Sequence, residues 1–177
     1  MIDVAEINET ARAWKVPPET IERDFALGWV LWAIANSRVF QRSLVFRGGT
    51  CLKKCYVDTH RFSEDLDFAV FEGSAPSVET FKSQLPAVLQ TASSTSGVNF
   101  YARDPVYESS TDRQAIHIKV YFVGPRQTPT PISIKLDIEL EETLVRPPVL
   151  RTIGHPYSDT LPTPDLVYCY GYGGALR

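Results

Sequence analysis

A glycine pair, Gly48-Gly49, between an apolar run and a helix-forming stretch is the feature that most constrains this fold. Residues 44–46 before it are typical of a buried strand, and residues 50–56 after it are typical of a short helix. A glycine turn that opens a helix aims backbone N–H groups at one point, which suits phosphate oxygens. The spacing matches neither a P-loop nor GxGxxG, and such a pair alone is more often an ordinary turn.

An acidic pair follows shortly after the glycine turn, where residues 66–71 predict a second strand. Asp65 and Asp67 are one residue apart, so both side chains lie on the same face of an extended chain. Two carboxylates beside a core strand are costly unless a cation lies between them. The pair therefore suggests a site for a divalent metal, although exposed carboxylates on a strand edge are common.

A third carboxylate lies on another predicted strand, residues 132–140. There apolar residues alternate with polar ones, which places Lys135 and Asp137 on one face. Three carboxylates that bridge divalent metal ions are the set that two-metal phosphoryl transfer requires.

Cations and hydroxyls flank both motifs. Arg47, Thr50 and Lys54 surround the glycine pair, and Arg61 and Ser63 precede the acidic pair. A guanidinium suits phosphate through its fixed fork of donors, whereas a serine in this position is as often a local cap. The combined pattern predicts chemistry on a nucleoside triphosphate.

The central segment resembles the signature of the AbiEii/AbiGii-type nucleotidyltransferase toxins, a branch of the polymerase-β-like nucleotidyltransferase superfamily that includes the MenT-like toxins. The resemblance lies in Gly48-Gly49-Thr50-x-Leu52-x-Lys54, then Arg61-x-Ser63-x-Asp65-Leu66-Asp67-Phe68, and later Lys135-Leu136-Asp137-Ile138. It spans roughly residues 15–145.

The resemblance implies a metal-dependent nucleotidyltransferase toxin of a bacterial toxin–antitoxin system. Asp65, Asp67 and Asp137 would be the catalytic metal ligands for Mg²⁺ or Mn²⁺. The implied nucleotide-binding residues are Gly48, Gly49, Thr50, Lys54, Arg61, Ser63 and Lys135. The substrate would be a nucleoside triphosphate, the acceptor an RNA such as the 3′ end of tRNA, and the protein partner a cognate antitoxin.

The predicted elements indicate an α+β fold with helices flanking a mixed, largely antiparallel sheet. We expect an N-terminal helical segment over residues 1–40, a catalytic core over 41–145 and an irregular tail over 146–177. The family continues into a helical region, which we expect to be short or missing here because Gly173-Gly174 are poor helix formers.

Further elements follow from periodicity. We predict helices over 18–37 and 77–91, the second kinked or ended early by Pro86. A serine-rich turn at 93–97 precedes predicted strands at 98–102 and 115–123.

Composition excludes several classes of protein. The 177 residues, 44% hydrophobic, suffice for one globular domain. A net charge of −3 argues against a strong non-specific grip on nucleic acid and leaves a local basic groove open. No stretch approaches the ~20 apolar residues of a membrane span, and the first residues are too polar for a signal peptide. We therefore expect a cytoplasmic protein without membrane contact.

Cysteines and histidines show no metal-binding spacing. With no CxxC pair, neither a disulfide framework nor a zinc site is indicated, and Cys51 and Cys55 are expected to be reduced packing residues. His60, His117 and His155 are expected at surface or strand positions.

Two other functions remain open. A catalytically impaired protein could bind a nucleotide or an antitoxin and transfer nothing. A metal-dependent nuclease could use the same carboxylates, but it would not need a glycine-hydroxyl cradle for phosphate.

Overall fold

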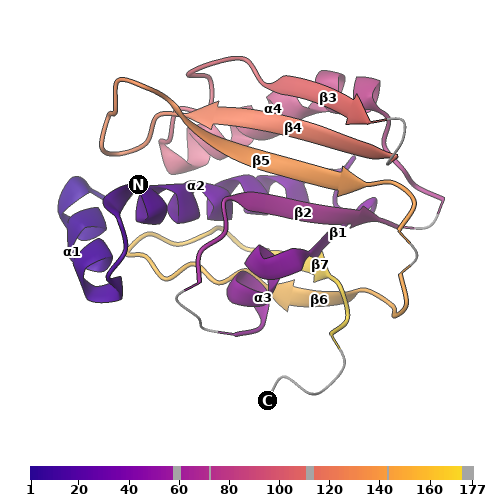
Figure 1. Ribbon diagram of the computed structural model, residues 1–177, viewed down its shortest axis with the longest axis horizontal. Helices are drawn as coiled ribbons and strands as arrows, with labels where there is room; N and C mark the ends of the chain where they lie inside the picture. Colours follow the sequence, from indigo (N-terminus) through magenta and orange to yellow (C-terminus); the bar gives the residue numbers. More distant parts are fainter. Residues whose placement is uncertain (58–60, 72, 111–113, 143, 173–177) are drawn as a thin grey trace.

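The computed structural model describes residues 1–57, 61–71, 73–110, 114–142 and 144–172. These residues form a seven-stranded sheet in the order β3-β4-β5-β2-β1-β7-β6 (Figure 1). The strands are β1 (Leu44–Arg47), β2 (Asp65–Val70), β3 (Val106–Ser110), β4 (Ala115–Phe122), β5 (Ile132–Glu139), β6 (Val149–Thr152) and β7 (Leu166–Cys169). The helices are α1 (Val4–Trp14), α2 (Pro18–Ala35), α3 (Gly48–Cys55) and α4 (Val78–Ser96).

The sheet is mixed. β2 pairs with β5, and β1 with β7, in parallel, whereas the other four neighbouring pairs are antiparallel. The predicted α+β fold with a mixed, largely antiparallel sheet is confirmed.

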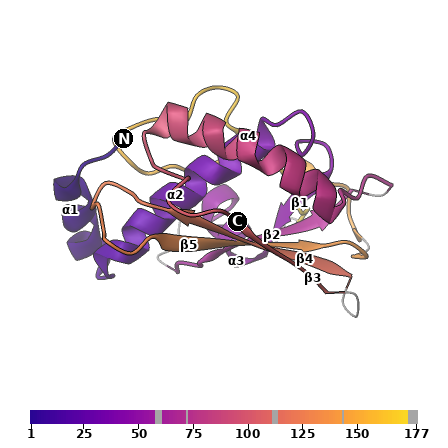
Figure 2. The same cartoon turned by 90° about the horizontal axis from the view of Figure 1, so that it is seen from above.

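One face of the sheet forms the core with α2 and α4, which lie on the same side of it (Figure 2). Leu66 and Phe68 on β2 and Leu136 on β5 are at most 1% exposed on this face. Because side chains alternate along a strand, the residues between them lie on the opposite face. That opposite face carries the aspartates of β2 and β5.

Helix α2 is buried on nearly every side, because the chain between β6 and β7 also covers it. The Trp32 indole donates a hydrogen bond to the Pro162 carbonyl at 2.8 Å, and the Asn36 amide donates to the Pro164 carbonyl at 3.0 Å. Apolar residues surround the helix axis from Phe25 to Ile34, which is typical of such an enclosed position. No helix in the described ranges is both long and apolar enough to cross a bilayer.

Helix α4 extends beyond its predicted end. It passes through Pro86 and continues to Ser96, so the predictions of an early end at Pro86 and of a serine-rich turn at 93–97 were wrong. Pro86 is exposed. The Ser96 hydroxyl donates to the Ala92 carbonyl at 2.6 Å, so the polar residues of the last turn are hydrogen-bonded within the helix. The helix ends at Gly97, whose φ of 80° is left-handed.

The strand prediction at 98–102 was also wrong. Only an isolated bridge between Asn99 and Val123 forms there, whereas the next segment, β3, pairs with β4 along its whole length. β3 is polar and largely exposed on an edge of the sheet, so it carries little hydrophobic alternation to reveal it.

Two strands, β6 and β7, lie in the segment expected to be an irregular tail. β7 adds a parallel neighbour to β1, and the Tyr170 amide donates to the Phe46 carbonyl at 2.8 Å. Val167 and Cys169 are buried, but an alternation over four residues is too short to recognise among prolines. Gly173-Gly174 and His60 lie outside the described residues.

Candidate active site

The exposed face of the sheet brings the predicted carboxylates together by strand register. Asp67 on β2 is the register partner of Asp137 on β5, and Asp65 is the register partner of Lys135. Register partners on neighbouring strands have side chains close enough to interact directly. The sheet therefore gathers three carboxylates and one lysine from segments about seventy residues apart.

The same register row continues onto β4 and adds a histidine. His117 is the register partner of Asp137, and its Nδ1 atom lies 2.6 Å from Oδ1 of Asp137. Both side chains are only partly exposed. A carboxylate accepts in this contact, so Nδ1 of His117 carries the proton. His117 thereby fixes the orientation of the Asp137 carboxylate.

The glycine turn lies directly against Asp67. Gly48 has a φ of +76°, and a Cβ on this residue would lie 3.1 Å from Cγ of Asp67. The position thus requires glycine for two reasons, the left-handed backbone and the close approach. By contrast, a Cβ on Gly49 would meet no described atom within 4 Å, so this side of the turn is open.

The start of α3 is held from the far end of the described chain. The Gly48 amide donates a hydrogen bond to the Tyr172 hydroxyl at 3.2 Å. No side chain among the described residues caps the helix at its N-cap residue, Arg47. Arg47 instead forms ion pairs with Glu139 and Glu142.

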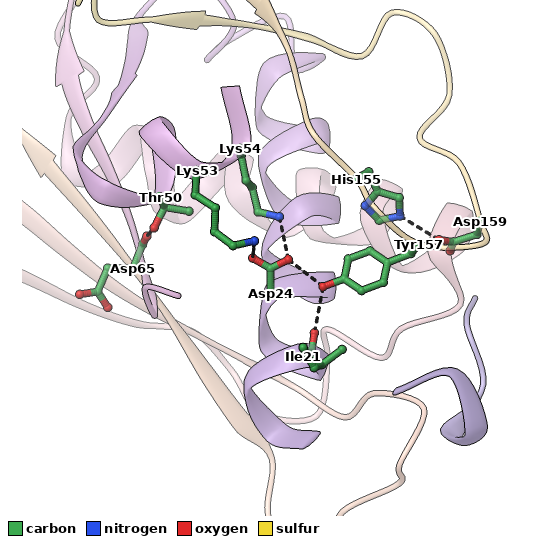
Figure 3. Close-up of polar contacts among 9 residues, drawn as sticks. All are labelled: Ile21, Asp24, Thr50, Lys53, Lys54, Asp65, His155, Tyr157 and Asp159. Atoms are coloured by element: carbon green, nitrogen blue, oxygen red, sulfur yellow. Dashed lines mark hydrogen bonds and ion pairs between the residues drawn. The ribbon is translucent and has the colours of Figure 1, made fainter. Parts of the chain in front are cut away.

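Thr50 is placed inside the fold rather than on the open face. Its side chain is 1% exposed, and its hydroxyl donates to the Asp65 carbonyl at 2.7 Å (Figure 3). The hydroxyl therefore fastens α3 to β2 at the acidic pair, which positions the turn against the carboxylates.

Lys54 does not join the carboxylates of β2 and β5. It is buried, and its Nζ atom lies 3.2 Å from Oδ2 of Asp24 on α2 (Figure 3). Lys53 binds the other oxygen of Asp24 at 3.1 Å, and the Tyr157 hydroxyl donates to Oδ2 at 2.7 Å. This network joins α2, α3 and the segment after β6.

The remaining predicted cations lie on β5 and in the segment before β2. Lys135 is exposed on β5 beside Asp137, and its register partner on β4 is Lys119. Both lysines, with His117 and Asp137, line a cavity of about 340 Å³. Arg61 is exposed and Ser63 partly exposed in the chain that leads into β2.

Electrostatics at the acidic pair are unfavourable without a cation. Burial raises the pKa of Asp67, and the nearby Asp137 and Asp65 carboxylates raise it further. Burial also raises the pKa of Asp65, against the opposing charge of Lys135. In Asp24, by contrast, the effect of burial is outweighed by Lys54 and Lys53, which lower its pKa.

The donor set fits a divalent metal. The Oδ1 atom of Asp65 is buried and has no hydrogen-bond partner in the described part of the chain. Oxygen ligands from carboxylates are those that Mg²⁺ and Mn²⁺ prefer. A cation held by Asp65, Asp67 and Asp137 would satisfy the unpaired oxygen and cancel the repulsion that raises the pKa of the pair.

Two residues of this arrangement were missed from the sequence. Strands β4 and β5 form a hairpin, so residues at equal distances from the middle of the connecting loop lie opposite each other. Counting residues outward from that loop would have placed His117 opposite Asp137. Tyr172 left no such signal, because its contact with Gly48 spans 124 residues.

Comparison with known families gives a match over most of the chain. A family model described as "Nucleotidyl transferase AbiEii toxin, Type IV TA system" matches residues 29–171. The chain belongs to the AbiEii family. Its members are nucleotidyltransferase toxins of toxin–antitoxin systems, so the family resemblance is confirmed. The AbiEii match reaches beyond residue 145 and includes both β6 and β7. No curated protein matches the chain.

Proposed function

We propose that this AbiEii protein is a cytoplasmic Mg²⁺- or Mn²⁺-dependent nucleotidyltransferase that adds nucleotides from a nucleoside triphosphate to RNA, with the 3′ end of tRNA as the acceptor, and so inhibits translation. One observation carries the proposal. Asp67 and Asp137 are register partners beside Asp65 on the same exposed face, and the glycine turn lies against Asp67.

The reaction joins the acceptor hydroxyl oxygen to the α-phosphorus and breaks the bond to pyrophosphate. A bound divalent cation would neutralise the leaving pyrophosphate and lower the pKa of the acceptor hydroxyl. Asp137, whose carboxylate contacts His117, would accept the hydroxyl proton. Each of these residues contributes through its position on a rigid sheet, so little reorganisation is needed.

Triphosphate binding would use the open side of the glycine turn together with exposed cations. The backbone at Gly49 faces no described atom where a Cβ would stand, which leaves room for phosphate oxygens. Lys135 is exposed and is the register partner of Asp65, and Arg61 and Ser63 precede Asp65 in the chain. Thr50 and Lys54 support the turn from inside the fold.

The test is a labelling reaction with purified full-length chain, Mg²⁺, total tRNA and each labelled nucleotide in turn. Wild-type protein is expected to label RNA, and Asp65→Asn is expected to abolish labelling. Glu64→Gln is the matched control, because Glu64 is the adjacent carboxylate, is exposed and pairs with Arg23.

Three outcomes would overturn the proposal. Labelling that survives Asp65→Asn would remove the carboxylates from the reaction. Binding of triphosphate without transfer to any acceptor would favour a binding protein. Shortened RNA in the absence of nucleotide would favour a nuclease.

A further inference from the structure

The fold gathers all three cysteines of the chain at one point. Cys51 and Cys55 lie one turn apart on α3, and Cys169 lies on β7. Their three Sγ atoms all lie within 4.8 Å of one another. Cys51 and Cys169 are fully buried, whereas Cys55 is partly exposed.

This spacing is close to that of sulfurs that share a metal. A Zn–S bond is about 2.3 Å, so the sulfurs around one tetrahedral zinc ion are roughly 3.8 Å apart. Small side-chain rotations would bring the thiols to that separation. A disulfide, by contrast, would use two of the three sulfurs and leave one unpaired.

One cation lies close to the partly exposed cysteine. The Arg151 guanidinium stacks over the Tyr56 ring at 4.6 Å, and Tyr56 directly follows Cys55 in the chain. A guanidinium near a thiolate stabilises the negative charge on its sulfur.

We propose that Cys51, Cys55 and Cys169 bind one Zn²⁺ ion, with water or a small external ligand in the fourth position on the side of Cys55. Binding releases three S–H protons to solvent, and the cluster changes from neutral to a charge of −1. The same three thiolates around Cu(I) would carry −2, which a largely buried site tolerates less well.

The ion would cross-link two parts of the fold that meet at the proposed active site. Cys51 directly follows Thr50, and β7 is the parallel neighbour of β1, which leads into the glycine turn. Zinc would therefore hold β7 against α3 and stabilise the turn. This role concerns structure and does not depend on the transferase reaction.

The experiment measures metal content and ligand type in the full chain, purified under reducing conditions. After exposure to Zn²⁺ and removal of free metal, elemental analysis is expected to find one zinc ion per chain. Cobalt substitution is expected to produce thiolate-to-metal charge-transfer absorption and the visible bands of a tetrahedral site. Cys55→Ala should reduce zinc retention by roughly tenfold or more, because it removes one of three ligands.

Controls separate this site from the carboxylates and from misfolding. Asp65→Asn should retain zinc fully, because the Asp65 side chain lies on the opposite face of the sheet from Cys169. Circular dichroism of Cys55→Ala checks that the partly exposed position tolerates the change. The proposal is overturned if zinc is absent, if it survives replacement of all three cysteines by alanine, or if Asp65→Asn loses it. Retention of Cu(I) alone, or a disulfide in place of metal under these conditions, would overturn it as well.

Discussion

His117 and Asp137 form a short side-chain contact between β4 and β5, with Nδ1 2.6 Å from Oδ1. Removing His117 frees the Asp137 carboxylate to rotate while leaving all three carboxylates in place. Loss of such an orienting partner typically costs 10–100-fold in metal affinity or activity. We expect His117→Ala to lower the kcat/KM of nucleotide transfer by roughly that factor and to raise the Mg²⁺ concentration required.

Two variants make the His117 prediction specific. His117→Asn keeps a side-chain donor near Asp137 and should recover part of the activity. Tyr121 lies on the same face of β4 as His117, with Lys119 between them. Tyr121→Phe should therefore leave the kcat/KM of transfer and the Mg²⁺ requirement unchanged. An unchanged Mg²⁺ requirement in His117→Ala would contradict an orienting role.

Asp67→Asn should stabilise the metal-free protein at neutral pH although it abolishes transfer. Because the folded-state pKa of Asp67 is raised, its carboxyl favours folding below its ordinary pKa of 3.8 and loses that contribution as pH rises through the folded value. The charged carboxylate thus costs stability at pH 7, and the gain on removing it should be about 1 kcal/mol.

Urea unfolding measured from pH 3.5 to 8 checks the sign for Asp67. The advantage of Asp67→Asn should shrink as the pH falls and also shrink when Mg²⁺ is added, because metal stabilises only the wild type. Glu64→Gln removes an exposed charge next to Asp65 and should show neither trend. An advantage that grows in acid would show that the charge of Asp67 is not the cause.

The two glycines of the turn should respond differently to alanine. Gly48→Ala forces a side chain into the left-handed region and against Asp67, so a loss of roughly 2 kcal/mol in the free energy of unfolding is expected. Gly49→Ala adds a Cβ in open space and should leave stability unchanged or slightly raised.

Nucleotide binding distinguishes the glycines further. If phosphate oxygens approach Gly49, its alanine variant should keep wild-type stability but show a raised KM for the nucleoside triphosphate. Thermal denaturation and initial rates measure the two effects separately. Equal stability losses at both positions would show that the turn is not pressed against Asp67.

Asp24→Asn should be strongly destabilising. Asp24 is the shared partner of Lys53 and Lys54, and its side chain is 2% exposed, so the substitution removes the negative charge that the buried Lys54 ammonium group contacts. Removing one partner of a buried ion pair typically costs about 3–5 kcal/mol. Denaturant unfolding at pH 7 measures the loss directly.

The pH dependence of the Asp24 network has the opposite sign to that of Asp67. Its folded-state pKa is lowered, so its contribution is present above the ordinary value of 3.8 and is lost as pH falls through the folded value. The exposed Glu79 pairs with Lys82 at 3.0 Å and is the matched control. Glu79→Gln should change stability little, and an equal loss in both variants would show that burial is not decisive.

Local patterns predicted much of the fold and the acidic site. The glycine pair, the Asp65/Asp67 alternation and the alternation around Asp137 each depend on a few neighbouring residues, so the strands and the shared face could be read directly. Helix α4 was misjudged because the effect of Pro86 depends on which side of the helix meets solvent.

Contacts between distant segments could not be predicted in this way. Lys54 has the charge expected of a phosphate ligand, but its side chain points to Asp24, a buried carboxylate on α2. The three cysteines have no metal-binding spacing, and they meet only because β7 pairs with β1. Both outcomes depend on tertiary packing, which leaves no local periodicity.

The hydrogen bond between Gly48 and Tyr172 has a consequence for the order of synthesis. A ribosome makes the turn 124 residues before the hydroxyl that holds it, and β1 lacks its β7 neighbour until the same late stage. A nascent chain therefore exposes an unpaired edge of β1 beside an unsecured turn until residue 172 has been made. The glycine turn that lies against Asp67 therefore gains its hydroxyl partner and the neighbour of its strand only after the catalytic carboxylates proposed here have all been made.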